Sequence, residues 1–220
     1  MTEPTQPDQP ARVDPPARPD PSSQPDPSSQ PEPTQPEPPA PLRSALVAEA
    51  LEFGFSHAAL MDPAKLRVRD EVRDMCAADR CHSYGRSWSC PPGCGTLDDS
   101  RRVLARYRCG LILQTTGELE DPYDYEGMMA PGEEQQRRLI EFRDELWGRY
   151  PNMLALGNGA CAVCAPEECT YPDSSCRYPD QMVQSMEAFG LIVSDTCADN
   201  DLGYYYGPNT ITYTGCYLLE

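Results

Sequence analysis

The chain has 220 residues, among them 25 prolines and 11 cysteines, and a formal net charge of −17. Recognition of a nucleic-acid backbone needs a basic surface, so this charge argues against a nucleic-acid partner. No apolar run approaches the roughly 20 residues of a membrane span, and the polar, acidic start lacks the features of a secretory signal, so we expect a cytoplasmic protein without a membrane partner.

The first 41 residues differ in composition from the rest. They hold 15 of the 25 prolines and no cysteine, and the sequence Pro-Asp-Pro-Ser-Ser-Gln occurs at 19–24 and again at 25–30. Such proline density removes backbone donors and leaves little apolar surface to bury, which favours extended polyproline conformations. We therefore predict a disordered, proline-rich tail over 1–41 and a cysteine-rich metal-binding domain over 42–220.

Hydrophobic periodicity and turn signals predict alternating helices and strands in the domain. Gly54 is expected to end the first helix, Thr96 followed by acidic residues is typical of a helix start, and Pro131 is expected to open a long amphipathic helix. The predicted helices span 42–53, 70–78, 96–107, 131–149 and 180–189. The predicted strands span 57–61, 109–115, 153–156, 191–193 and 210–218. This order indicates an α+β or α/β sandwich, with a small sheet, flanking helices and two cysteine-rich metal-binding loops.

Eight of the eleven cysteines form two groups of four, with spacings C-x4-C-x8-C-x3-C and C-x2-C-x4-C-x6-C. Thiols stay reduced in the cytoplasm, so metal ligation explains these clusters better than disulfides do. Four thiolates around one centre are typical of tetrahedral zinc or of an iron–sulfur cluster. The predicted metal ligands are Cys76, Cys81, Cys90 and Cys94 in the first group and Cys161, Cys164, Cys169 and Cys176 in the second.

The spacing of the cysteines also bears on the metal. Structural zinc usually takes two C-x2-C knuckles, whereas the first group has none and the second has one. The wider spacings favour a 4Fe-4S cluster, in which each iron takes one cysteine, and Pro91 after Cys90 is similar to the Cys-Pro end of ferredoxin motifs. We therefore expect one or two 4Fe-4S clusters, with zinc as the alternative. Four aromatic residues could shield a cluster from water: Tyr84, Trp88, Tyr171 and Tyr178.

The remaining cysteines and the two histidines carry weaker signals. Cys109 begins an apolar run and is expected in the core, as are Cys197 and Cys216 near the C-terminal strand. His57 is expected to be a core or edge residue, and His82 a surface residue or a neighbour of the ligands. No phosphate-binding loop or dinucleotide-binding glycine motif is present.

Several motifs together resemble one family. The segments are WSCPPGCGTL at 88–97, GACAVC at 159–164, CRYP at 176–179 and SMEAFG at 185–190. They resemble the bacterial and archaeal family of cysteine-rich predicted metal-binding proteins, over roughly residues 76–218. The resemblance implies metal binding by the cysteines but no particular reaction. Relative to the usual spacing, residues 165–168 are an insertion before Cys169.

Three functions are compatible with these observations. The leading hypothesis is an iron–sulfur protein that transfers electrons, with up to two 4Fe-4S clusters. The first alternative is an interaction protein with structural zinc. The second is a cluster-dependent reductase with an open iron site, which requires that one group supplies only three ligands. The acidic surface is compatible with docking of a basic redox partner protein.

Overall fold

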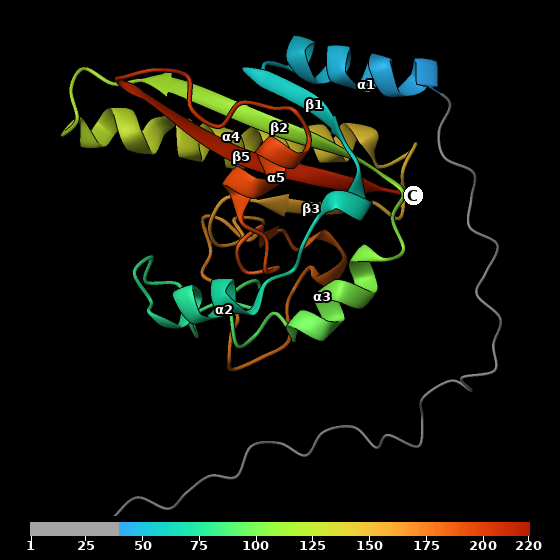
Figure 1. Ribbon diagram of the computed structural model, residues 1–220. Coiled ribbons are helices and arrows are strands. Elements are labelled where there is room, and N and C mark those ends of the chain that lie inside the picture. Colours follow the sequence, from blue (N-terminus) through green and yellow to red (C-terminus); the bar gives the residue numbers. More distant parts are fainter. Residues whose placement is uncertain (1–39) are drawn as a thin grey trace, which may run out of the picture. The chain divides into compact units, whose positions relative to one another are not determined.

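A computed structural model describes residues 40–220 of the chain, with side chains from residue 45 onward (Figure 1). The tail predicted over 1–41 lies outside the described residues apart from its last two positions. These two positions begin the first helix, α1 (Ala40–Phe53), which ends before Gly54 as the sequence predicts. No helix within the described range is long and apolar enough to cross a membrane.

A small five-stranded sheet forms the centre of the domain, with the strand order β1-β2-β5-β3-β4. Neighbouring strands are antiparallel except β3 and β4, which run parallel. The longest pairing joins β2 to β5 from Cys109 opposite Leu219 to Glu118 opposite Thr210. The strands are β1 (His57–Met61), β2 (Cys109–Glu118), β3 (Leu154–Gly157), β4 (Gln184–Ser185) and β5 (Thr210–Leu219).

The two faces of the sheet are covered differently (Figure 1). Alternation along β2 sends Leu111 and Leu113 into a core with α1 and α4, whereas Ile112 belongs to a second core with α5 and the end of α3. Both faces of the central strands are therefore shielded from water. This explains why the first half of β2 is a continuous run of apolar residues. The remaining helices are α2 (Asp70–Ala77), α3 (Leu97–Leu104), α4 (Tyr125–Leu146) and α5 (Val193–Asp199).

This arrangement confirms the α+β prediction and most of the predicted elements. The strand over 57–61 matches β1, and the strands predicted over 109–115, 153–156 and 210–218 correspond to β2, β3 and β5. Helix α3 starts after Thr96 in a reciprocal capping box with Asp99, although it ends at Leu104 and not at residue 107.

Helix α4 begins six residues earlier than predicted. Asp124 caps it by accepting a hydrogen bond from the Gly127 amide at 2.8 Å, so Pro131 lies inside the helix and does not open it. The proline ring packs against β2 at Gly117, where an added Cβ would lie 2.1 Å from Pro131 Cγ. A glycine on the neighbouring strand thus makes room for a proline that normally disfavours a helix interior.

The helix predicted over 180–189 is wrong. The segment forms a short 3-10 turn over Pro179–Gln181 and then β4, which pairs with β3 through Leu156 opposite Gln184. Gly190 has a φ of 98° and redirects the chain. The strand predicted over 191–193 is also wrong, because α5 begins there; its first turn has no side-chain cap, and burial of Thr196 and Cys197 stabilises it.

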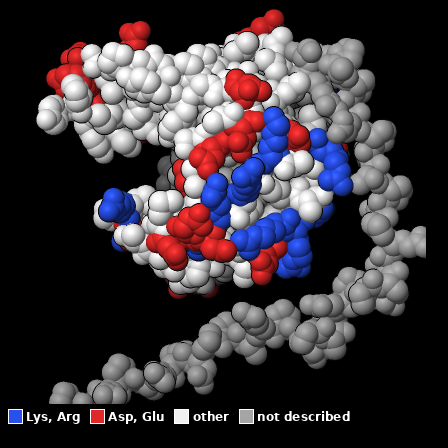
Figure 2. Space-filling view, in the orientation of Figure 1, with Lys and Arg blue, Asp and Glu red and all other residues white. Residues whose placement is uncertain are grey.

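Acidic and basic side chains are interleaved on the face shown in Figure 2. Arg101 pairs with both Asp70 and Asp98, and Arg102 pairs with Asp99. These pairs neutralise one another locally at the surface, and exposed pairs of this kind contribute little to stability.

The double-sided core predicts a large loss of stability when a central side chain is truncated. Leu113 is fully buried on β2, so we expect Leu113→Ala to lower the free energy of unfolding by about 2–5 kcal/mol. The control is Leu51→Ala on α1, where the side chain is 45% exposed and the expected change is about 0.5 kcal/mol. Urea unfolding followed by circular dichroism measures both, and equal losses would contradict the assigned core.

Candidate metal centre

The first cysteine group lies at the end of α2 and in the loop that follows it. Cys76 is on the last turn of α2, and the other three members are in the connection to α3. Backbone hydrogen bonds fold this loop, from Gly85 N to the Pro91 carbonyl and from Cys94 N to the Cys90 carbonyl. The loop bonds to itself and not to a sheet, so its cysteines can face inward from several directions.

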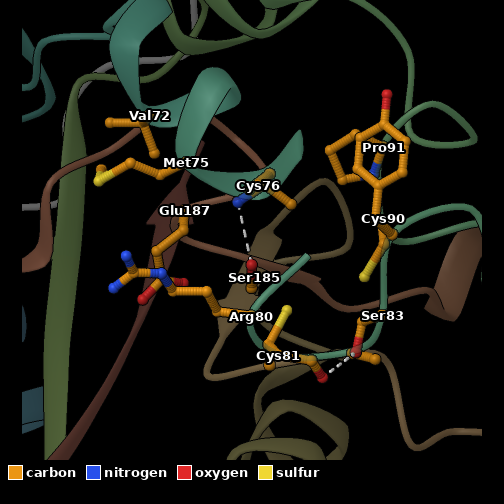
Figure 3. A pocket seen from close by; sticks show the side chains of 14 residues that line it. Val72, Met75, Cys76, Arg80, Cys81, Ser83, Cys90, Pro91, Ser185 and Glu187 are labelled. Carbon is orange, nitrogen blue, oxygen red and sulfur yellow. Dashed lines mark hydrogen bonds between the residues drawn. The ribbon is translucent and has the colours of Figure 1, made fainter. Parts of the chain in front are cut away.

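Three of these cysteines surround one pocket with a volume of about 380 Å³ (Figure 3). Cys76 contributes from the helix, and Cys81 and Cys90 contribute from the loop. Val72, Met75 and Cys76 recur at helical spacing, so one face of α2 forms a wall of this pocket. The opposite side comes from segments distant in sequence, namely 159–160 and 185–188. The fold therefore brings three predicted ligands of the first group together.

The electrostatics of the pocket confirm that these groups are neighbours. Desolvation raises the pKa of the Cys76 thiol, Arg73 opposes this shift, and Cys81, Glu187 and Cys90 add to it. Desolvation also raises the pKa of the Glu187 carboxyl group. Glu187 is an exposed residue that lines the pocket, and nearby protein atoms partly desolvate its carboxyl group. A positive charge in this pocket would therefore favour the ionised forms of several neighbouring acidic groups at once.

Cys94 occupies a different position from the other three. It does not line the pocket, and its sulfur accepts a hydrogen bond from Arg73 Nη1 at 3.5 Å. Burial raises the pKa of the Cys94 thiol, while Arg73 lowers it. Cys94 nevertheless remains within electrostatic reach of Cys90, which joins it to the rest of its group.

The second cysteine group follows β3. Cys161 accepts a hydrogen bond at its sulfur from Val183 N at 3.4 Å, and it interacts electrostatically with Cys164 and Cys176. Desolvation raises the pKa of the Cys161 thiol. The structure gives no comparable interaction for Cys169 within its described part. Three members of this group thus lie together, and the role of Cys169 stays a prediction.

The two cysteine loops pack against each other. The Cys161 amide donates to Ser89 Oγ at 2.9 Å, and Trp88 Nε1 donates to the Ser174 carbonyl at 3.0 Å. The Trp88 and Tyr171 rings meet edge to face with centroids 4.9 Å apart. These two aromatic residues lie between the loops, whereas the side chains of Tyr84 and Tyr178 are 38% and 45% exposed.

The sulfurs are not gathered tightly around a single point. In the described part of the chain, no three Cys, His, Asp or Glu side chains come close enough to hold one metal ion. The thiol donors suit a soft metal or an iron–sulfur cluster. Arg73 Nε beside the first group is buried and has no hydrogen-bond partner among the described residues, which fits an anionic group at this place.

The remaining cysteines and histidines do not belong to these groups. Cys109, Cys197 and Cys216 are buried in the core, as predicted, and burial raises the pKa of the Cys216 thiol far above its usual range. His57 begins the edge strand β1 and stacks on Tyr206 with centroids 3.8 Å apart. His82 is exposed in the first loop with a φ of 56°.

Sequence reasoning missed several polar residues of the site. Arg73 donates to the Cys94 sulfur and Arg177 interacts electrostatically with Cys164. Ser89 connects the loops, and Glu187 lines the pocket. The sequence does contain a signal for Arg73. It lies three residues before Cys76 in a predicted helix, so both side chains lie on the same side of that helix. Glu187 is about 100 residues away in sequence, so only the fold reveals its place.

Comparison with protein families agrees with this description. Residues 59–219 match the family described as Predicted metal-binding protein (DUF2284). The match covers β1 to β5 and includes all eight clustered cysteines. No curated protein and no solved structure gives a significant match.

The contact between the loops predicts a structural role for Ser89. We expect Ser89→Ala to destabilise the protein by roughly 1–3 kcal/mol, because the Cys161 amide loses its partner. The matched control is Ser83→Ala, which removes a surface hydrogen bond to the Cys81 carbonyl and is expected to change stability by about 0.5 kcal/mol or less. Thermal unfolding of both variants gives the comparison, and equal midpoints would argue against this contact.

Proposed function

Because the chain belongs to the predicted metal-binding protein family DUF2284, we propose that its two cysteine groups hold iron–sulfur clusters and that the protein transfers electrons. The observation that carries this proposal is the pocket of about 380 Å³ with Cys76, Cys81 and Cys90 on its walls. The first cluster takes these three thiolates together with Cys94. The second takes Cys161, Cys164 and Cys176 together with Cys169.

The separation of the sulfurs supports a cluster over zinc. Thiolates lie about 2.3 Å from a zinc ion, so the four sulfurs of a tetrahedral site are only about 3.8 Å from one another. In a 4Fe-4S cluster each cysteine binds its own iron, so the sulfurs stand farther apart. Three members of the first group line a pocket, and no three-ligand set for one ion exists among the described residues. This arrangement suits a 4Fe-4S cluster better than a single zinc ion.

The surroundings support an electron-transfer role. A bound cluster supplies one-electron redox chemistry. Trp88 and Tyr171 pack edge to face where the two loops meet, and Cys76 and Cys94 are partly buried. Cys81 is exposed, so it brings one edge of the first group to the surface, where a redox partner protein can approach. The chain thus combines a shielded side with an accessible side.

A reductase with an open iron site is the second candidate, and a specific observation favours it. Only three cysteines of the first group line the pocket, and Cys94 is held aside by Arg73. If Cys94 does not bind, one iron faces a pocket that Glu187 and apolar side chains also line. A small molecule could then reach that iron.

Single cysteine substitutions test the proposal. We expect Cys76→Ser, Cys81→Ser and Cys90→Ser each to remove the iron of one cluster and its EPR signal after reduction, because each loses a thiolate ligand. Cys216→Ala is the matched control, since this buried thiol lies in the core away from both groups and its loss should leave the iron count unchanged. Iron and sulfide are counted in protein purified without oxygen.

The same series distinguishes the two candidates. Loss of iron in Cys94→Ser would indicate a four-cysteine centre, whereas a full iron count would indicate an open site. Stoichiometric zinc without sulfide in the unmodified chain would contradict both candidates and favour structural zinc.

A further inference from the structure

Arg73 has an unusual set of partners beside the first cysteine group. Its Nη1 donates to Cys94 Sγ at 3.5 Å and to the Gly95 carbonyl at 3.1 Å, and its Nη2 donates to the Ala188 carbonyl at 2.9 Å. One guanidinium group therefore connects α2, the first cysteine loop and the segment after β4. Both Cys76 and Arg73 lie on α2 one turn apart, so the helix that supplies a ligand also supplies the charge.

The charge of Arg73 is not matched by a carboxylate. Among the described residues, no ion pair joins Arg73 to an aspartate or a glutamate, although the neighbouring Arg69 pairs with Asp195 at 3.1 Å. The partners of Arg73 are two carbonyl oxygens and a sulfur, and its buried Nε has no hydrogen-bond partner in the part of the chain that the structure describes. A partly buried cation normally needs an anionic partner, and the cysteines beside Arg73 become anionic when they bind a metal.

We propose that Arg73 is the charge-compensating residue of the first centre and raises the reduction potential of the cluster held there. The inference rests on the iron–sulfur function proposed above. Reduction adds one electron to the centre, and no covalent bond breaks and no proton has to move. A fixed positive charge and a hydrogen bond to a ligand sulfur favour the more negative, reduced state, so both raise the potential. Arg73 acts through Cys94 and is a positioning residue.

The second group provides an internal comparison. Arg177 also interacts electrostatically with a cysteine, Cys164, but it is exposed and lies 3.4 Å from a carboxylate oxygen of Glu167. Water and this carboxylate screen its charge. We therefore expect Arg73 to change the reduction potential of the first centre more than Arg177 changes that of the second.

Potentiometric titration followed by EPR tests the proposal in the full chain purified without oxygen, with dithionite as the reductant. The signal of the first centre is identified as the one lost in Cys90→Ser. We expect Arg73→Gln to lower the midpoint potential of that signal, because the charge is gone. Arg73→Lys keeps the charge and should stay near the unmodified chain, while losing thermal stability because lysine cannot bridge the same three acceptors.

Two control variants complete the experiment. Arg69→Gln removes a neighbouring surface charge and should leave the potential unchanged. Arg177→Gln should shift the signal of the second centre by less than Arg73→Gln shifts that of the first. If Arg73→Gln does not fold, Arg73→Met takes its place, because it also removes the charge. A lower potential in that variant would support the inference, and a potential equal to that of the unmodified chain would overturn it.

The outcomes separate this inference from the proposed function. An intact cluster whose potential is the same in Arg73→Gln and in the unmodified chain would overturn only the role of Arg73. An unmodified chain without sulfide and without an EPR signal would overturn the iron–sulfur function, and the inference with it. A potential that falls in Arg73→Gln and is retained in Arg73→Lys would support both.

Discussion

The contact between the two cysteine loops is the constraint on which the candidate centre depends. The amide of Cys161 donates to Ser89 Oγ, and Trp88 packs on Tyr171 and donates to the Ser174 carbonyl. Neither loop is part of the sheet, so their contact with each other helps to hold both. The position of the second loop in turn follows from β3, which ends four residues before Cys161 and pairs with the buried strand β5.

Charge is the second condition that the site must meet. The chain as a whole is strongly acidic, with a net charge of −17, and clustered thiolates add further negative charge. The structure places one arginine beside a sulfur in each group, Arg73 beside Cys94 and Arg177 beside Cys164. These contacts are local, and they allow anionic ligands to be partly buried in an acidic protein.

Much of the fold follows from the sequence, because most of its elements carry local signals. The apolar run of β2 and the helix start at Thr96 are examples, since the sequence predicts both. The errors concern elements whose conformation depends on distant contacts. The segment around Gln184 forms a strand because β3 lies beside it, and Pro131 is tolerated inside α4 because Gly117 on β2 makes room for its ring.

In the candidate site, too, the features with a local signal are predictable and those that depend on distant contacts are not. Cysteine spacing predicted both groups, and the structure brings Cys76, Cys81 and Cys90 around one pocket. Spacing could not reveal Glu187 or Ser89, because their roles arise only when separate loops meet.

The most direct test of the central claim is the metal and acid-labile sulfide content of the unmodified chain purified without oxygen. The account predicts iron and sulfide in equal amounts and an EPR signal after reduction. A colourless protein with stoichiometric zinc and no sulfide would contradict it.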